Sequence, residues 1–477
     1  MRHEAQSSPA KESEPRQRTD PAGRHNTVRL ACTTAATLAL AVATGCGIAS
    51  VAAPPALATA TQPYSGHGEL ADVAHGKLYL HGGPAGVSRR VTLPGLPYAP
   101  AWSADGRWLA VEVSKPPPSG QPYLTNPATL WLVNAAGTST RRLSPASWQV
   151  SDFAWAPRQD ELAVAAYQSS APPARSSLVA TLTLAGQLKM LAAAPVLNGP
   201  AWSPDGTRLA IGTATFTAGQ WHGGLDVLSL AGGPPAVAAT STGNVLELAG
   251  WRPDGQGLLY WLDAEGSASL AADGLPLDSV PLGPGTPRTL LPAMLVQGAW
   301  LAPSPLGNTF AAVSGGDRVI WSGGKRITLC PVAGRCTPVP QPPGVVSLDP
   351  AWSPGGTTLV FARLSASGPF GPGGHAGFSP AWIARWEATS RLWTVSAAQP
   401  LTAARPLTAA GPGALDPVWG RDGSLLFVRN DALWLLPLHA VAPTRLTGPL
   451  GALVGPAYYR TYYGYVPYPQ LFAWTLA

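Results

Sequence analysis

The sequence predicts an all-β fold built from many short strands, and three observations support this. A motif that contains a tryptophan and usually an Asp-Gly pair recurs at intervals of 47 to 67 residues. Glycine and proline, which favour turns, number 53 and 52 among 477 residues. Hydrophobic residues make up 45% of the chain and charged residues only 12%, which is enough apolar surface for a large core. A strand-rich repeat near this length predicts a β-propeller of four-stranded antiparallel blades.

The recurring motif is clearest at 100–113 (PAWSADGRWLAVEV) and 200–213 (PAWSPDGTRLAIGT). Its tryptophan ends a first strand, where the indole can pack between neighbouring sheets. Its Asp-Gly pair supplies the positive φ of a tight hairpin, so we expect these aspartates to be structural, and the following apolar run forms a second strand. The motif tryptophans are Trp102, Trp155, Trp202, Trp251, Trp300, Trp352 and Trp419. The Asp-Gly pairs are Asp105 with Gly106, Asp205 with Gly206, Asp254 with Gly255, and Asp422 with Gly423.

Further strands complete each blade, and the two ends of the repeat region complement each other. Segments 76–80 and 89–93 look like a third and a fourth strand, whereas 457–461 and 471–475 look like a first and a second. Joining them into one blade removes exposed sheet edges. We therefore expect a propeller over 71–477 with eight blades, the last closed by both termini, and seven blades as the alternative.

The repeat is similar to that of a known family. The Trp-Ser-Pro-Asp-Gly motif, followed by an apolar strand and a late Arg-Leu-Thr as at 445–447, resembles the TolB-like β-propeller repeat over residues 70–477. The resemblance implies the propeller fold and assigns no function.

The N-terminal region reads as an export signal or a membrane anchor. Residues 1–29 form a polar, cytoplasmic n-region, and 30–60 a signal peptide or transmembrane helix, because 30–53 carries no charge. Three fates stay open: an uncleaved anchor, cleavage after Ala58 or Ala60, or lipidation of Cys46, since the segment ATGC at 43–46 resembles a bacterial lipobox. Residues 61–70 are then a linker. Each fate places the propeller outside the cytoplasm, anchored to the outer side of the cytoplasmic membrane or secreted.

Two cysteines lie close together in the repeat region. Cys330 and Cys336 stand in the segment LCPVAGRCTP. An isolated pair in an exported chain indicates a disulfide bond that pins one hairpin.

The long connections are nearly all between the second and third strands of a blade, so they gather on one face of the propeller, which is the candidate binding face. They span 114–128, 168–176, 214–224 and 364–390. Loops on a rigid scaffold often carry recognition. The binding-loop candidates are Phe370, His375, Phe378, Trp382, Arg385, Trp386, Trp221 and His222. Packing of Trp382 and Trp386 as part of a short helix is the alternative.

No catalytic or metal motif is present, and no cofactor is predicted. The sequence lacks a Gly-x-Ser-x-Gly elbow, a His-Glu-x-x-His motif and a basic stripe typical of nucleic-acid binding. We therefore expect a non-catalytic binding or scaffold propeller whose partner is an envelope protein or a cell-wall polymer. Two alternatives stay open: a sensory ectodomain, or a lactonase- or glycan-lyase-like enzyme, which would need acidic residues such as Asp72, Asp152, Glu247 and Asp416 to converge at the channel mouth.

Overall fold

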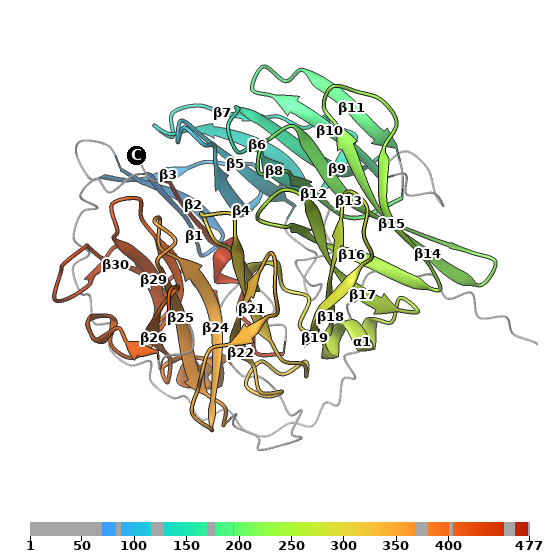
Figure 1. Cartoon of the computed structure of the whole chain (residues 1–477). Coiled ribbons are helices and arrows are strands. Elements are labelled where there is room, and N and C mark those ends of the chain that lie inside the picture. The colour runs from blue at the N-terminus through green and yellow to red at the C-terminus, as the bar shows by residue number, and fades with distance from the viewer. Residues whose placement is uncertain are drawn as a thin grey trace, which may run out of the picture. The chain divides into compact units, whose positions relative to one another are not determined.

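The computed structural model describes residues 69–82, 87–115, 128–168, 177–193, 195–367, 380–399, 404–452 and 463–475. All of them belong to the second of two compact units, Ala56–Ala477. This unit is an all-β propeller of four-stranded antiparallel sheets, which confirms the predicted fold class (Figure 1). The predicted segments 1–29, 30–60 and 61–68, with Cys46, lie outside the described residues.

The strands follow one another in simple up-and-down order. Two four-stranded units share one larger sheet through a single pairing of Ala128 with Val150. They contain β4 (Leu96–Trp102), β5 (Trp108–Ser114), β6 (Ala128–Asn134) and β7 (Thr140–Arg142), then β8 (Trp148–Trp155), β9 (Glu161–Gln168), β10 (Ser177–Thr183) and β11 (Leu188–Ala193). The next two sheets contain β12 (Val196–Trp202), β13 (Arg208–Thr217), β14 (Gln220–Ser229) and β15 (Ala236–Thr242), then β16 (Asn244–Trp251), β17 (Gly257–Ala264), β18 (Leu275–Pro281) and β19 (Arg288–Met294).

Three further sheets continue the same order. They contain β20 (Leu301–Pro303), β21 (Thr309–Ser314), β22 (Arg326–Pro331) and β23 (Thr337–Pro338), then β24 (Val345–Trp352), β25 (Thr358–Ser365), β26 (Arg391–Ser396) and β27 (Arg405–Pro406), and then β28 (Ala414–Trp419), β29 (Leu425–Arg429), β30 (Ala432–Leu436) and β31 (Thr444–Arg445). The described helical elements are α1 (Ala268–Asp273), α2 (Pro380–Glu387) and the short 3₁₀ turns η2 (Gly298–Trp300), η3 (Thr408–Ala410) and η4 (Tyr468–Gln470). None of these described helices is both long and apolar enough to cross a lipid bilayer.

The remaining sheet joins the two ends of the repeat region, but not in the way the sequence predicts. Its order is β3 (Val87–Val91), β2 (Lys77–Gly82), β1 (Glu69–Ala74) and β32 (Phe472–Thr475). Three of these strands come from the N-terminal end of the repeat region, and a single strand comes from its C-terminal end. The prediction of two strands from each end is therefore wrong: β32 is the first strand, and β1, which begins inside the predicted linker, is the second. Segment 457–461 lies outside the described residues.

Six of the seven motif tryptophans fasten their sheet to the preceding one. In each case the indole Nε1–H donates to a backbone carbonyl of the preceding first strand, at 2.9 to 3.2 Å. Trp102, for example, donates to Ala473 of β32, so the mixed sheet precedes β4–β7. Because the indole lies between two sheets, it adds packing area and satisfies a carbonyl oxygen at the same time.

Contacts also join the remaining neighbours. Arg318 holds Asp273 through two nitrogens, at 2.5 and 2.6 Å, which links the β20–β23 sheet to the sheet before it. At the other junction, His75 N–H donates to Leu450 O at 2.7 Å, which links the mixed sheet to the end of the β28–β31 sheet. The contacts between consecutive units therefore form a closed circuit.

The second strand of each sheet forms the core. Leu209, Ala210 and Ile211 of β13 are buried, as is the run from Leu359 to Ala362 of β25. A strand that is covered on both faces has apolar residues without alternation, and this matches the apolar runs that follow the Asp-Gly pairs.

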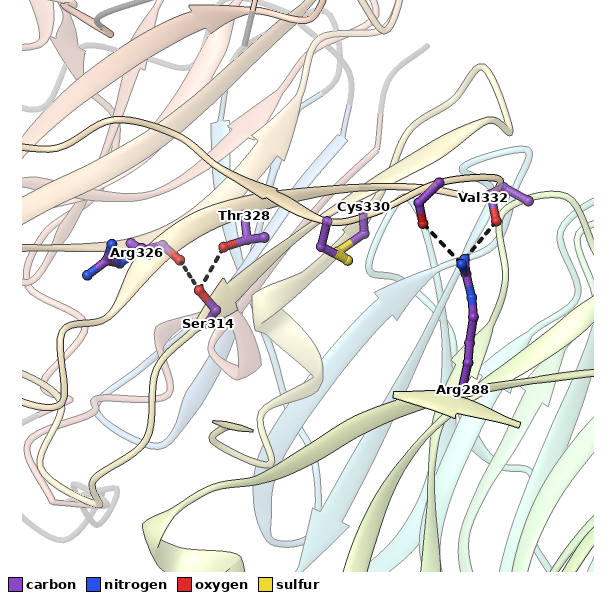
Figure 2. The surroundings of a disulfide bond; sticks show 8 residues. Arg288, Ser314, Arg326, Thr328, Cys330 and Val332 are labelled. Atoms are coloured by element: carbon purple, nitrogen blue, oxygen red, sulfur yellow. Dashed lines mark hydrogen bonds between the residues drawn. A yellow bond between two sulfur atoms is a disulfide. The ribbon is translucent and has the colours of Figure 1, made fainter. Parts of the chain in front are cut away.

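The structure joins Cys330 and Cys336 by a disulfide bond (Figure 2). Cys330 belongs to β22, and the bond closes the turn toward β23. Arg288 of the preceding sheet donates to the carbonyls of Gly334 and Val332 in this turn, at 3.0 and 3.1 Å. The disulfide therefore fixes a turn that also contacts the neighbouring sheet.

Candidate binding face

Antiparallel order divides the connections of every sheet between two faces. The first–second and third–fourth connections emerge at one end, which we call the turn face. The second–third connections and the links from sheet to sheet emerge at the other end, which we call the loop face. The two faces therefore offer a binding partner different sets of side chains.

The turn face carries short turns stabilised by the Asp-Gly pairs. Asp205 accepts hydrogen bonds from Ser203 Oγ at 2.5 Å and from Thr207 N–H at 3.0 Å, and these hold its pKa at about 2. Gly206 has a φ of 73°, which a residue with a side chain adopts at a cost. Asp105, Asp254 and Asp422 accept turn amides in the same way. These carboxylates are engaged in building turns.

On the loop face, the connection predicted as a loop at 214–224 is instead the end of a long hairpin. Strands β13 and β14 pair from Arg208 with Ser229 up to Thr217 with Gln220. At its tip the rings of Phe216 and Trp221 meet edge-to-face, with centroids 5.2 Å apart. Phe216 is 59% exposed.

The hairpin tip lies against the neighbouring sheet. Trp221 covers Gly266, where even a methyl group would come within 2.4 Å of the indole Nε1. Helix α1 begins two residues later and exposes Leu270 to 47%. His222 lies in the β14 ladder, opposite Thr215 and Thr242. The two sheets thus present Phe216, Trp221 and Leu270, which we call the tip patch.

The tryptophans of helix α2 pack against the rest of the protein. Trp386 is 4% exposed and donates its indole N–H to Ser365 O at 2.8 Å. Trp382 and Trp386 both contact Trp321, with ring centroids 5.1 and 5.5 Å apart, while Arg385 stays exposed. Trp386 is therefore a structural residue. The candidates Phe370, His375 and Phe378 lie outside the described residues.

A buried lysine shapes the adjacent connection between β21 and β22. Lys325 is fully buried, and its Nζ lies 2.8 to 3.0 Å from four backbone carbonyls, those of Gly316, Asp317, Val319 and Ser322. Burial lowers the pKa of Lys325 to about 7. Four acceptors oppose that effect, because an ammonium has more N–H groups to share than a neutral amine. The loop is folded around this side chain.

The C-terminal segment 463–471 lies among the first strands. Tyr465 and Tyr468 are buried, at 8% and 1% exposure. The Tyr465 ring meets Trp300 edge-to-face at 5.7 Å, and Tyr468 Oη donates to Glu387 Oε2 at 3.2 Å. Figure 1 shows η4, in red, between the sheets, where it contacts β4. This segment therefore contacts the first strands β4 and β32 and helix α2.

Four carboxyl groups lie near these tyrosines, those of Asp349, Asp416, Glu387 and Asp431. Burial raises the pKa of Glu387 to about 8 and that of Asp349 to about 6, and burial with the charge of Asp349 raises the pKa of Asp416 well above its ordinary value. Asp349 accepts from Trp300 Nε1 at 3.2 Å. We call Asp349, Asp416 and Glu387 the carboxyl cluster. Sequence inspection missed Asp349 and Glu387, because they come from separate elements, strand β24 and helix α2, and no local motif marks them.

The acidic residues named for an enzymatic channel mouth do not share one set of neighbours. Asp152 lies near Glu112, Glu247 near Asp263, and Asp416 in the carboxyl cluster. Asp72 is hydrogen-bonded to His81. Within the described residues no group of three or more His, Cys, Asp or Glu is arranged to hold a metal ion.

No protein-family model and no curated protein matches the chain. Among solved structures, the chain is similar to a puromycin-hydrolyzing peptidase of Mycobacterium tuberculosis (14% identity, TM-score 0.42), covering 69% of this chain and 48% of that one. It is also similar to an acylaminoacyl peptidase (10%, 0.44), covering 74% and 52%. The chain thus spans about half the length of both. A third similar structure is a putative TolB from Agrobacterium tumefaciens (16%, 0.33), covering 78% and 99%. None of these similarities bears on what the chain binds.

Proposed function

We propose that the chain is a non-catalytic, extracytoplasmic binding propeller whose eight four-stranded units are blades of one ring. Its loop face recognises a protein of the cell envelope. The tip patch is the described portion of that face which contacts the partner. The turn face, where the Asp-Gly carboxylates are taken up by their own turns, does not take part in this binding.

The exposure of Phe216 carries this proposal. A single exposed apolar side chain is common on protein surfaces, whereas a group of them marks an interaction site. Here an aromatic pair near the tip of a long hairpin contacts the turn at Gly266, which precedes a helix that exposes Leu270. Aromatic side chains held on a rigid scaffold are frequent anchors of protein interfaces.

The N-terminal composition supports the extracytoplasmic location. The uncharged stretch 30–53 follows Arg24 and Arg29, which is the order expected for a cytoplasmic N-terminus. We propose that 30–60 carries the propeller across the membrane and retains it there. Cell fractionation tests this, and comparison of Cys46→Ala with the unchanged chain tests lipidation. Recovery of the whole chain in the cytoplasm would contradict the proposal.

The binding proposal is tested with the full-length protein in mild detergent. We expect an envelope extract to yield a cross-linked protein partner that is identified by mass spectrometry and then purified. Phe216→Ser should weaken binding of that purified partner by roughly 30-fold, the effect of losing about 2 kcal/mol at an interface anchor.

Val441→Ser is the matched control, because Val441 is 92% exposed in a third–fourth turn of the opposite face. It should leave the affinity unchanged. Equal affinities for Phe216→Ser and the unchanged protein would remove the tip patch from the proposal. Binding of purified cell-wall polymer in place of any protein would replace the partner class.

A further inference from the structure

A serine, a histidine and an aspartate lie together across three strands of the mixed sheet. His81 of β2 pairs directly with Ser88 of β3, and Asp72 of β1 lies diagonally opposite His81. Ser88 Oγ is 2.7 Å from His81 Nδ1, and His81 Nε2 is hydrogen-bonded to Asp72 Oδ1. Side chains of directly paired residues point to the same side of an antiparallel sheet, so the register itself brings the three together.

Solvent access changes along this row. Asp72 and His81 are buried, at 1% and 6% exposure, whereas Ser88 is exposed on the edge strand. A ligand can therefore reach the serine hydroxyl, while the carboxylate is shielded from water. This is the order of burial that a nucleophile and its supporting groups require.

The hydrogen bonds define the role of each imidazole nitrogen. A carboxylate can only accept, so Nε2 carries the hydrogen that is donated to Asp72. In the neutral imidazole, Nδ1 then has a lone pair and accepts from the hydroxyl of Ser88. Asp72 thus holds His81 in the tautomer that can take a proton from Ser88.

A nucleophile next to a base, with the base oriented by a third group, is the general arrangement for activating a serine. In the Ser-His-Asp triad of hydrolases the two imidazole nitrogens have the opposite assignment. Arg90 follows Ser88 by two residues on the same strand, so it lies on the same side of the sheet. Its positive charge favours negative charge that develops nearby during an attack.

We propose that Ser88 is an activated nucleophile that accepts an acyl group from an activated carboxylic ester. In this step Ser88 Oγ forms a bond to the carbonyl carbon, and the bond from that carbon to the leaving oxygen breaks. The hydroxyl proton passes to His81 Nδ1 and from there to the departing oxygen. Ser88 follows a third–fourth connection and lies toward the turn face, so the inference is independent of the proposed partner binding.

The full-length protein is tested with p-nitrophenyl acetate, and acetylation is located by peptide mass spectrometry. We expect Ser88 to be acetylated at least 100-fold faster than Ser139, an exposed serine in a turn of the same face. Ser88→Ala should abolish this product, and His81→Gln should slow it at least 100-fold. Acetylation of Ser88 at the rate of Ser139 would overturn the proposal.

Because His81 is buried, His81→Gln can disturb folding, so a surface variant gives a second measurement. Ser88→Cys places a thiol beside Nδ1, and Ser139→Cys is its matched control. We expect iodoacetamide to alkylate Ser88→Cys at least 10-fold faster than Ser139→Cys at pH 6, because a base and a cation favour the thiolate. Identical rates from pH 5 to 9 would show that the three residues are only a structural hydrogen-bond row.

Discussion

The motif tryptophan of the β20–β23 sheet and the motif tryptophans of six other sheets form different hydrogen bonds. In six cases the indole N–H donates backward to a main-chain carbonyl of the preceding sheet. Trp300 lies in η2 and donates forward to the side chain of Asp349. The motif therefore predicts where the tryptophan lies, but its partner depends on what surrounds that sheet.

The exceptional sheet is also the place where the non-repeated segments meet. The loop around Lys325, helix α2 and the segment 463–471 all pack there, through Trp321 and Tyr465. A departure from the repeat thus coincides with added structure. Three variants distinguish this sheet from the regular ones.

The largest expected effect is that of Lys325→Met. Four carbonyl oxygens lose their shared donor in a fully buried position, which should cost about 3 to 5 kcal/mol. Chemical denaturation measures the loss. Lys189→Met is the control, because this exposed lysine donates to one carbonyl, Leu230 O, and should cost under about 0.5 kcal/mol. Equal losses in the free energy of unfolding for the two variants would mean that the four hydrogen bonds of Lys325 do not stabilise the loop.

The carboxyl cluster should make stability depend on pH. The folded protein holds protons on Glu387 and Asp416 that the unfolded chain releases above about pH 4.5, so stability falls as pH rises from there to about 8. Glu387→Gln removes one such proton and should reduce the loss between pH 5 and 8 by about 2 kcal/mol. Exposed Glu265 provides the control Glu265→Gln, which should leave the pH profile unchanged. Parallel profiles for both variants would exclude a titrating cluster.

The smallest expected effect separates the two kinds of tryptophan. Trp202→Phe removes a bond to a neutral carbonyl and should cost about 1 to 2 kcal/mol equally at pH 5 and pH 8. Trp300→Phe removes a donor to Asp349, whose pKa of about 6 lies between these values. Its cost should be about 1 kcal/mol larger at pH 8, because hydrogen bonds to charged groups are stronger. A pH-independent cost for both would remove the distinction.

The sequence predicts the repeated regions of the fold well, because their signals are local. An indole before an Asp-Gly turn and an apolar strand occurs within 14 residues and defines a hairpin wherever it appears. The strand Glu69–Ala74 escapes prediction because no turn motif precedes it. The hairpin around Phe216 reads as a loop because Ala218-Gly219 is a weak turn signal.

Sites built from several strands are beyond sequence inspection. Glu387 meets Tyr468 across a large sequence separation, and Ser88 meets His81 only through the register of β2 and β3. Neither arrangement has a spacing that could be recognised before the sheets are assembled. The tip patch is intermediate, since the sequence marks Trp221 and His222 as candidates but not Leu270.

The first strand of the mixed sheet has a consequence for how the protein is made. Leu70 is among the first described residues to leave the ribosome, yet its partner Trp474 is synthesised after every other sheet. Until then β1 has an unpaired edge that can associate with other chains. Completion of the ring is therefore a late, non-local event, and this sheet is completed only after β32 has been synthesised.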